Sequence, residues 1–469
     1  MKKILISIAS GFLFSTLFYN QNVGLNMLLF AIIAIVTVFV IQEKARRMEV
    51  YLSAGLYLLC SLFVVIVNTT FSIFTSIVSF VIFSGSISGF KNSIYVQWFN
   101  GIYQLLAGAL HQLTSKKEEK TISSKKYNIG FIILTTVIVI TILIIFIVLY
   151  GSVNPILGGW LSKIDLSFLS ISWILTTVMG YLLVNNLLST AELGLITTLD
   201  RKASTLLKQR EINDLTEKKL AKEQLLGSIL MIALNVLILL FIALDISYVI
   251  NNPLSDAVAL SKTVHEGVTA LIASIVIAIT IILILFRGNL NFYKESEKLR
   301  KLTYAWIILN IVIILLTAYK NYLYSDGFGL TYKRIGVFIY LALCISGMVT
   351  TYFKIAKKHN FLFMIQTNAR VAFIIMIVIS SFSWDRTITQ QNLNQVAHPD
   401  IPYLLSMSDN TADLLYAFAK AHPEKATNQS YIDTEYERWI QRLSNQSWQE
   451  KTLQGMLNSK IASNEIQNN

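Results

Sequence analysis

The stretch "IGFIILTTVIVITILIIFIVLYG", Ile129–Gly151, decides the class of this protein. It contains no charged residue, and it is longer than the roughly 20 apolar residues that a helix needs to cross a bilayer. Helices suit such a run because they satisfy all of their own backbone hydrogen bonds within lipid. Similar runs recur along the chain, so the sequence predicts an all-α, polytopic transmembrane helix bundle.

The composition supports this class. The chain has 469 residues, of which 54% are hydrophobic and 14% are charged, with a mean hydropathy of +0.58. Soluble domains carry about 25% charged residues. The protein therefore has too little polar surface to enclose its apolar residues in water.

Eleven spanning segments are expected in residues 1–382. Their approximate bounds are 4–20, 24–42, 50–67, 70–90, 129–150, 168–187, 226–246, 268–286, 303–320, 335–353 and 361–382. The first segment resembles a signal peptide but lacks a small-residue cleavage site, so we expect it to be retained as a helix. The first two segments could alternatively form a tight helical hairpin.

The cations alternate along the chain. The N-terminus and the even-numbered connections carry 26 Lys and Arg residues, and the odd-numbered connections carry five. Cytoplasmic loops are enriched in Lys and Arg. The pattern predicts a multi-pass membrane protein with its N-terminus in the cytoplasm. An odd number of crossings then places the C-terminus outside.

Residues 383–469 form a soluble C-terminal region that we expect to be helical and extracytoplasmic. Its net charge is −3, against +15 for residues 1–382, so the basic excess belongs to the membrane part and reports topology. A stretch such as "SDNTADLLYAFAKAHP", Ser408–Pro423, has helical apolar spacing between a cap and a proline. We expect this region to dock on the membrane part or on a protein partner. No nucleic-acid partner is expected.

A further charged stretch, Asp200–Gln224, has helical spacing. It predicts either a solvated cytoplasmic helix or a helical extension of the seventh segment.

Polar residues within spanning segments need a physical reason, and three are considered for function. Arg370 is about nine residues inside the last segment, so it is either a buried cation that pairs or binds, or an interfacial residue that reaches the headgroups. Asn235 and Asn310 are expected to hydrogen-bond across helix interfaces. The bilayer is the main partner that these segments imply.

His265, Glu266 and Gly267 open the eighth segment. Thr263 with Glu266 matches the capping-box spacing T-x-x-E, which is a structural explanation; a metal site with Asp256 is the alternative, although the spacing fits no strong motif. Cys60 and Cys344 lie in apolar runs and are interpreted as small core residues. We therefore expect no catalytic set, no metal and no cofactor.

The connection "YLYSDGFGLTYKRIG", Tyr322–Gly336, is interpreted as an ordered external turn, with a ligand-binding role as the alternative. Gly327 and Gly329 permit a tight reversal with positive φ. Its tyrosines suit the headgroup layer. Lys333 and Arg334 could meet lipid phosphates, or pair with Asp326 or with the acidic C-terminal region.

Several motifs resemble a family of bacterial polytopic membrane proteins known as a domain of unknown function, the 4153 group, and its 4173 relatives. The resemblance covers residues 245–415 most clearly, with Phe328 standing where the family usually has tyrosine. It implies a fold and a bacterial source, and therefore a place in the bacterial cytoplasmic (inner) membrane, and it assigns no activity. The matching positions are His265–Val268, Trp306, Asn310, Tyr324–Arg334, Trp384, Asp385, Asn392, Leu393, Asp400, Tyr403 and Leu404.

Three functions are compatible with these features. The first is a non-enzymatic sensing, regulatory or envelope-associated membrane module. The second is a transporter or flippase that uses polar groups in the bundle, and the third is a membrane enzyme acting on lipid or envelope precursors. The candidate functional cluster consists of His265, Glu266, Gly267, Asn310, Tyr324, Asp326, Gly329, Thr331, Lys333, Arg334, Arg370, Trp384, Asp385 and Asn392.

Overall fold

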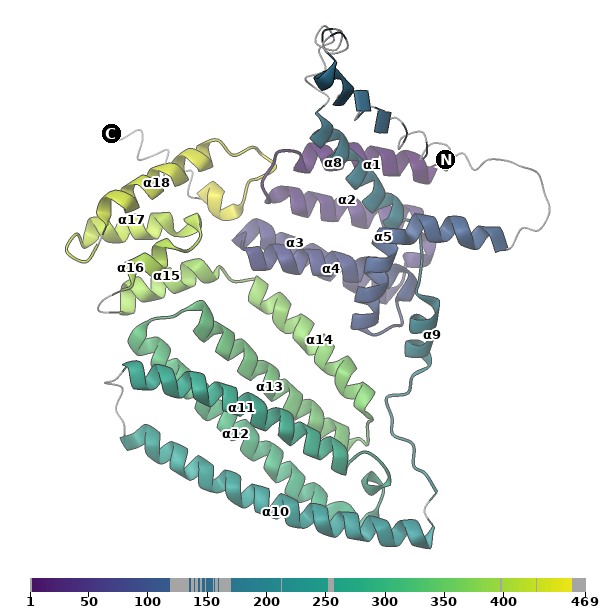
Figure 1. Cartoon of the computed structure of the whole chain (residues 1–469), viewed down its shortest axis with the longest axis vertical. Coiled ribbons are helices and arrows are strands. Elements are labelled where there is room, and N and C mark those ends of the chain that lie inside the picture. Colours follow the sequence, from purple (N-terminus) through teal and green to yellow (C-terminus); the bar gives the residue numbers. More distant parts are fainter. Residues whose placement is uncertain are drawn as a thin grey trace. The chain divides into compact units, whose positions relative to one another are not determined.

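The computed structural model describes residues 2–118, isolated positions between 135 and 159, and residues 170–211, 213–251, 257–396, 399–426 and 428–457. The description excludes the side chains of Lys44, residues 112–118 and residues 257–269. The described residues form helices and no strand, apart from one isolated antiparallel bridge between Leu206 and His359. The predicted all-α class is therefore confirmed (Figure 1).

The chain divides into two compact units. Unit 1 comprises Met1–Lys202 together with Leu443–Asn469. Its helices are α1 (Lys2–Phe18), α2 (Leu25–Ile41), α3 (Met48–Val67), α4 (Thr70–Gly89), α5 (Ile94–Glu118), α8 (Ile171–Leu187) and α9 (Gly194–Lys202).

Unit 2 comprises Ala203–Arg442. Its long helices are α10 (Asp214–Asn251), α11 (Ala257–Leu285), α12 (Glu297–Phe328), α13 (Tyr332–Ala356) and α14 (Phe361–Ser380). Four helices follow them, α15 (Trp384–Gln395), α16 (Ile401–Leu405), α17 (Ala412–Ala421) and α18 (Gln429–Ser444), the last of which ends just beyond the boundary of the unit.

Six of the described helices are long and apolar enough to cross a membrane. They are α3, α4, α10, α13, α14 and the helical stretch Lys294–Phe328, which contains α12. Shorter apolar helical stretches are Leu25–Ile41, Ile171–Leu187 and Ala270–Leu285. The predicted fifth segment, 129–150, lies almost wholly outside the described residues. Eleven crossings therefore remain a prediction.

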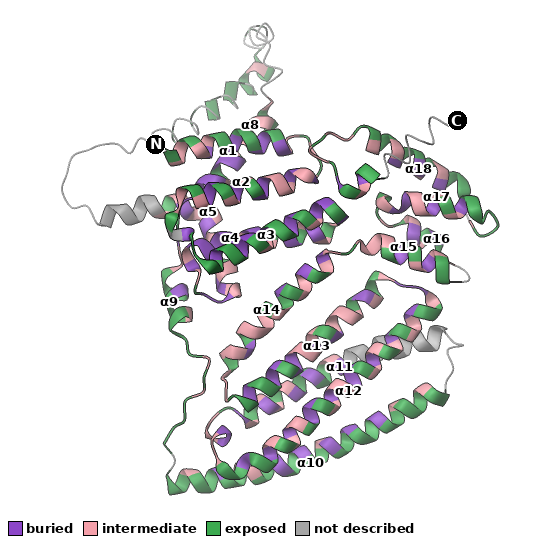
Figure 2. Ribbon diagram, turned by 180° about the vertical axis from the view of Figure 1, so that it is seen from behind, coloured by how far each residue is buried: buried purple, intermediate pink, exposed green. Residues whose placement is uncertain are grey.

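The apolar surface of α10 is turned outward. Leu226, Ile229, Leu237, Leu240 and Leu244 are each more than half exposed, and the exposed colour follows this helix along most of its length (Figure 2). Burying apolar surface is favourable by about 25 cal/mol per Å², so such a face is unstable in water. A lipid bilayer would cover it.

Helix α5 lies between the fourth and fifth expected segments, in a connection for which the sequence analysis named no helix. Small residues let α4 and α5 touch backbone to backbone. A Cβ atom on Gly85 would lie 1.8 Å from the Gln97 carbonyl oxygen, and one on Gly101 would lie 1.9 Å from the Val81 carbonyl oxygen. The glycines thus set the contact between the two helices, as small residues do in membrane bundles.

The stretch Asp200–Gln224 is not one helix. Only its last part extends the seventh segment, because α10 begins at Asp214. The residues between α9 and α10 run along the α13–α14 turn, with the Leu207 amide donating to the Lys358 carbonyl (3.0 Å) and the Asn360 amide donating to the Thr205 carbonyl (2.9 Å). The segment between α9 and α10 therefore packs against the α13–α14 turn of unit 2.

The last described residues return to unit 1. The Leu25 amide donates to the Lys451 carbonyl (3.1 Å), and the Asn26 amide donates to the Gln449 carbonyl (2.9 Å). A Cβ on Gly24 would lie 2.2 Å from the Glu450 carbonyl oxygen. The C-terminal segment thus packs on the turn between α1 and α2.

Substituting Gly101 with alanine is expected to lower the thermal stability of the purified protein. The added methyl group must push α5 away from Val81, and overpacking of this kind costs about 1–3 kcal/mol. The control is Gly55→Ala in α3, because a Cβ there meets nothing within 4 Å; it should leave the midpoint unchanged or raise it slightly. Equal midpoints for the two variants in a thermal-unfolding assay would contradict the contact.

Candidate functional site

Asn392 holds the loop between α12 and α13 through its side-chain amide. Its Oδ1 accepts a hydrogen bond from the Leu330 amide (2.6 Å), and its Nδ2 donates to the Leu330 carbonyl (3.0 Å). Asn392 is 5% exposed. We call this pair of bonds the Asn392 clamp. It joins the loop to α15 in the C-terminal helical region.

Gly329 makes the clamp possible. Its φ is +83°, which L side chains rarely adopt. A Cβ at this position would also lie 2.8 Å from Asn392 Oδ1. The predicted reversal at Gly329 is therefore confirmed. Gly327, the other glycine proposed for the turn, lies within α12.

Other candidate residues surround the clamp. The Tyr332 hydroxyl donates to Asp385 Oδ1 (2.6 Å), and the Trp384 indole donates to the Ile379 carbonyl (3.0 Å). Thr331 caps α13, because its Oγ1 accepts from the Arg334 amide (3.4 Å). The clamp and these three contacts form what we call the loop cluster.

Arg334 serves the same loop. Its guanidinium lies 3.8 Å from the ring centre of Tyr324 and donates to the carbonyls of Phe328 and Gly329. Asp326 and Lys333 are exposed and form no ion pair with a described residue, so the alternative of a pair with Asp326 is not found. The cation stabilises the turn instead.

The loop cluster connects to a small apolar core. Leu330 and Ile335 are buried against Ile388, Leu404 and Leu415 of the C-terminal helices. Arg386 adds an ion pair to Asp413 (2.7 Å). The motif residues around the loop therefore fasten α15–α17 to the α12–α13 hairpin, and they do not converge on a cavity.

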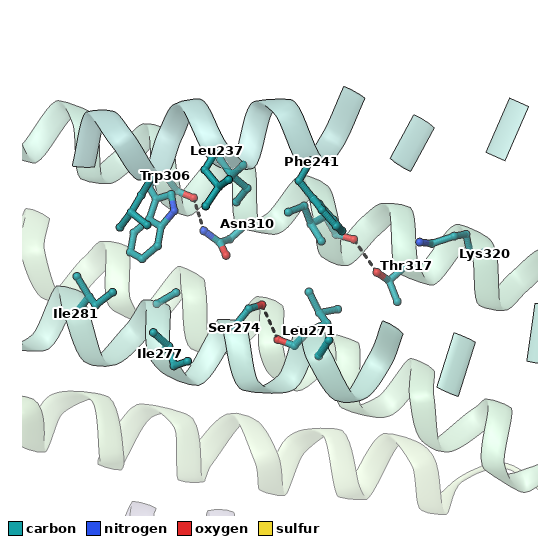
Figure 3. Close-up of a pocket in the computed structure, with 15 residues that line it drawn as sticks. Leu237, Phe241, Leu271, Ser274, Ile277, Ile281, Trp306, Asn310, Thr317 and Lys320 are labelled. Atoms are coloured by element: carbon teal, nitrogen blue, oxygen red, sulfur yellow. Dashed lines mark hydrogen bonds between the residues drawn. The ribbon is translucent and has the colours of Figure 1, made fainter. Parts of the chain in front are cut away.

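A cavity of about 590 Å³ lies elsewhere in unit 2, between α10, α11 and α12. We call it the groove (Figure 3). Most of its lining is aliphatic or aromatic, including Leu237, Phe241 and Ile277. Trp306 and Asn310, which the sequence analysis singled out, line it from α12.

The polar groups of the groove are already engaged within their own helices. Asn310 Nδ2 donates to the Trp306 carbonyl (2.8 Å), the Ser274 hydroxyl donates to the Leu271 carbonyl (2.9 Å), and the Thr317 hydroxyl donates to the Ile313 carbonyl (3.0 Å). Asn310 was expected to bond across a helix interface, and among the described contacts it does not. The groove thus offers a mostly apolar surface.

Asn235 behaves as predicted. Its Nδ2 donates to the Leu302 carbonyl of α12 (3.0 Å) as well as to the Met231 carbonyl of its own helix (2.7 Å). This bond fixes α10 against α12 beside the groove.

An ion pair marks one end of the groove. Lys320 Nζ lies 2.8 and 3.0 Å from the two carboxylate oxygens of Asp245. The side chains of Lys320 and Asp245 are 18% and 12% exposed, respectively. Lys320 also lines the groove. This pair was not among the candidate residues, although both charges could be found at the ends of apolar segments.

The remaining candidates lie apart from both places. Arg370 is the tenth residue of α14, has an exposed side chain and lines neither the groove nor the loop cluster. Helix α11 begins at Ala257, so Thr263–Glu266 does not cap its start and the proposed capping box is wrong. The side chains of His265, Glu266 and Gly267 fall outside the described part. Among the described residues, no group of His, Cys, Asp or Glu is arranged to hold a metal.

Comparison with known proteins gives one match. A family model described as "Domain of unknown function (DUF4153)" matches residues 5–417. No curated protein and no solved structure matches the chain.

Replacing Asn392 with alanine is expected to loosen the C-terminal helical region. Both main-chain groups of Leu330 would be left buried without partners, at a combined cost of roughly 2 kcal/mol or more. Limited proteolysis of the purified protein should then cut within residues 384–442 much faster than in the wild type. Asn394→Ala, an exposed position on the same helix, is the control and should leave the cleavage rate unchanged.

The Lys320–Asp245 pair can be tested by a double-mutant cycle. Lys320→Met and Asp245→Leu should each lower stability, because each leaves a largely buried charge without its partner. The double variant should be more stable than the sum of the single effects predicts, with a coupling of about 1 kcal/mol or more. Additive effects in thermal unfolding would show that the pair contributes nothing.

Proposed function

Because the chain belongs to the DUF4153 family, a family defined without an activity, we propose its role from the geometry of unit 2. The protein is a non-enzymatic regulatory module of the membrane. It binds an acyl chain of a lipid in the groove and transmits occupancy to the C-terminal helices α15–α17. The observation that carries this proposal is the apolar groove, one of whose three walls is the same helix that ends at the Asn392 clamp.

The size and chemistry of the groove suit an acyl chain. Ligand pockets usually measure about 300–1,000 Å³, and this one falls within that range. The side chains of Ser274, Asn310 and Thr317 donate hydrogen bonds to carbonyls of their own helices. A polar solute would therefore find few free hydrogen-bonding groups. The Lys320–Asp245 pair supplies a charged contact at one end, where a headgroup would lie.

Helix α12 provides the connection from the groove to the C-terminal region. Trp306, Asn310 and Lys320 line the groove from this helix. Its 32 residues extend about 48 Å at 1.5 Å per residue, and Gly329 and Leu330 follow directly. A shift of α12 on lipid binding would therefore move the main chain that Asn392 holds.

Two contacts support an extracytoplasmic position for the C-terminal region. Asn392 binds the α12–α13 connection, and Lys451 binds the α1–α2 connection. Each contact requires both partners to be on one side of the bilayer. Both connections belong to the odd-numbered, cation-poor set, which the positive-inside rule assigns to the outside.

Lipid transport is the second candidate, because the ion pair beside the groove could guide a headgroup. The regulatory role is favoured over transport and catalysis because the candidate polar residues are dispersed. Arg370 and the residues of the loop cluster do not line the groove, and the described contacts of the loop cluster are structural.

Photo-crosslinking tests lipid binding directly. The purified protein is reconstituted with a phospholipid that carries a diazirine on its acyl chain, and the labelled residues are mapped by mass spectrometry. We expect labelling at groove residues such as Phe241 and Ile277. Ser274→Phe should fill the groove and lower that labelling about tenfold or more, whereas Ala273→Phe, on an adjacent exposed position outside the groove, should not.

Uniform labelling of lipid-facing positions such as Ile308 and Leu315, insensitive to Ser274→Phe, would contradict the proposal. The regulatory part has its own readout. The proteolysis rate of residues 384–442 should differ between wild-type protein with and without bound lipid, and Ser274→Phe should abolish that difference.

A further inference from the structure

A second and larger cavity lies at the opposite end of unit 2 from the loop cluster. It measures about 1,350 Å³ and is bounded by the start of α10, the ends of α11 and α13, and the segment between α9 and α10. Among the described residues, five cations line it: Lys208, Arg210, Lys219, Arg287 and Lys354. We call it the basic pocket.

Lys354 is the unusual member. It is 2% exposed, although lysine is almost never buried without a partner for its charge. Its Nζ donates to the Phe286 carbonyl at 2.6 Å, and an ammonium group has three donors. No carboxylate of a described residue pairs with it. Lys354 thus carries a buried positive charge. Among the described residues, this charge is compensated by one carbonyl group.

Two structural explanations account for part of this arrangement. The positive-inside rule explains why this side of the membrane is basic, and the Phe286 carbonyl at the end of α11 is a favourable place for a cation. The rule calls only for cations in the loops, where solvent can reach them. It does not explain why Lys354 is buried in a cavity that four other cations also line.

The walls of the pocket are held in place. Asn289 accepts a hydrogen bond from the Arg210 amide at its Oδ1 (2.9 Å) and donates from its Nδ2 to the Arg210 carbonyl (3.0 Å). The Leu207 amide donates to the Lys358 carbonyl (3.0 Å). The extended segment that carries Lys208 and Arg210 is therefore bonded to Asn289 on one side and to Lys358 on the other. These bonds keep the two cations at the rim of the pocket.

The charges of the pocket are unbalanced. Glu211 and Glu223 are its acidic lining residues, which leaves a formal excess of three positive charges. None of the five cations forms an ion pair with a described residue. Cations gathered in a partly enclosed cavity attract anions strongly, because the low dielectric of the walls concentrates the electric field of the cations.

The geometry points to a binding site for a phosphate-bearing anion in the basic pocket, with Lys354 at its base and Lys208, Arg210, Lys219 and Arg287 at its rim. Arginine and lysine bind phosphate through charge-assisted hydrogen bonds, which are about twice as strong as neutral ones. The phosphate belongs either to a soluble metabolite or to the headgroup of an anionic lipid. The site is separate from the groove and does not depend on the function proposed for it.

Isothermal titration calorimetry tests the site, with inorganic pyrophosphate added to the full-length protein in a neutral detergent. We expect saturable binding by the wild type. Lys354→Met and Lys219→Gln should each weaken it about tenfold, the loss expected for one charge-assisted contact. Lys218→Gln is the matched control, because Lys218 is an exposed neighbour that does not line the pocket; it should change the affinity by less than about twofold, as expected for a screened surface charge.

A second arm separates the two sources of phosphate. The titration is repeated in nanodiscs of phosphatidylcholine with and without phosphatidylglycerol. Weaker pyrophosphate binding in the presence of phosphatidylglycerol assigns the site to a lipid headgroup, and unchanged binding assigns it to a soluble anion. Both results support the proposal.

Three results would overturn it. The first is the absence of pyrophosphate binding in detergent and in nanodiscs, together with no retention of phosphatidylglycerol during purification. The second is an equal loss of affinity in the Lys218 and Lys219 variants, which would indicate a diffuse surface charge. The third is wild-type affinity in a folded Lys354→Met variant. If that variant does not fold, Arg210→Gln takes its place, and wild-type affinity in Arg210→Gln and Lys219→Gln would overturn the proposal equally.

Discussion

The structure depends on one constraint, which is that main-chain groups released at helix ends and turns must find partners without help from water. Asparagine side chains meet this need repeatedly. In unit 1, Asn26 donates to the Leu17 carbonyl in the last turn of α1 (3.0 Å). In unit 2, Asn289 and Asn392 do the same for the carbonyls of Arg210 and Leu330, which lie in connections between helices. An amide carries both a donor and an acceptor, so it can replace a missing main-chain neighbour.

This constraint explains why most of the residues that carry the family resemblance do not line a cavity. The stretch around Tyr324–Arg334 and the residues Trp384, Asp385 and Asn392 carry much of the family resemblance. Their described contacts pair a loop with a helix and fill a small core. The two cavities are lined instead by apolar side chains and, in the basic pocket, by cations of helices and loops. Ligand capacity in this protein therefore comes from the spacing of its helices.

Much of the fold could be predicted, because burial in lipid leaves a strong pattern in the sequence. Ten of the eleven expected segments overlap described helices, and seven of them agree with the helix bounds to within several residues. Helices α10, α11 and α12 extend well beyond the apolar run. A hydropathy pattern does not show these helix extensions, because the added helical turns are polar. Helix α5 was missed for a related reason, since its residues Asn100 and Gln104 are polar and yet fully buried. The candidate site was predicted less well. Asn310 lines a cavity and Asn392 holds a loop, but Lys320 and Lys354 were counted only as topology signals.

The sequence by itself determined the all-α membrane class, the family and the order of the helices, because each of these follows from local composition and spacing. It also determined the reversal at Gly329, since glycine is the residue that adopts positive φ without strain. Only the tertiary structure decided which of the polar groups face a cavity. Lys320 meets Asp245 across 75 residues, and Lys354 meets Phe286 across 68. Contacts between distant residues depend on how helices rotate and pack, which no local pattern records.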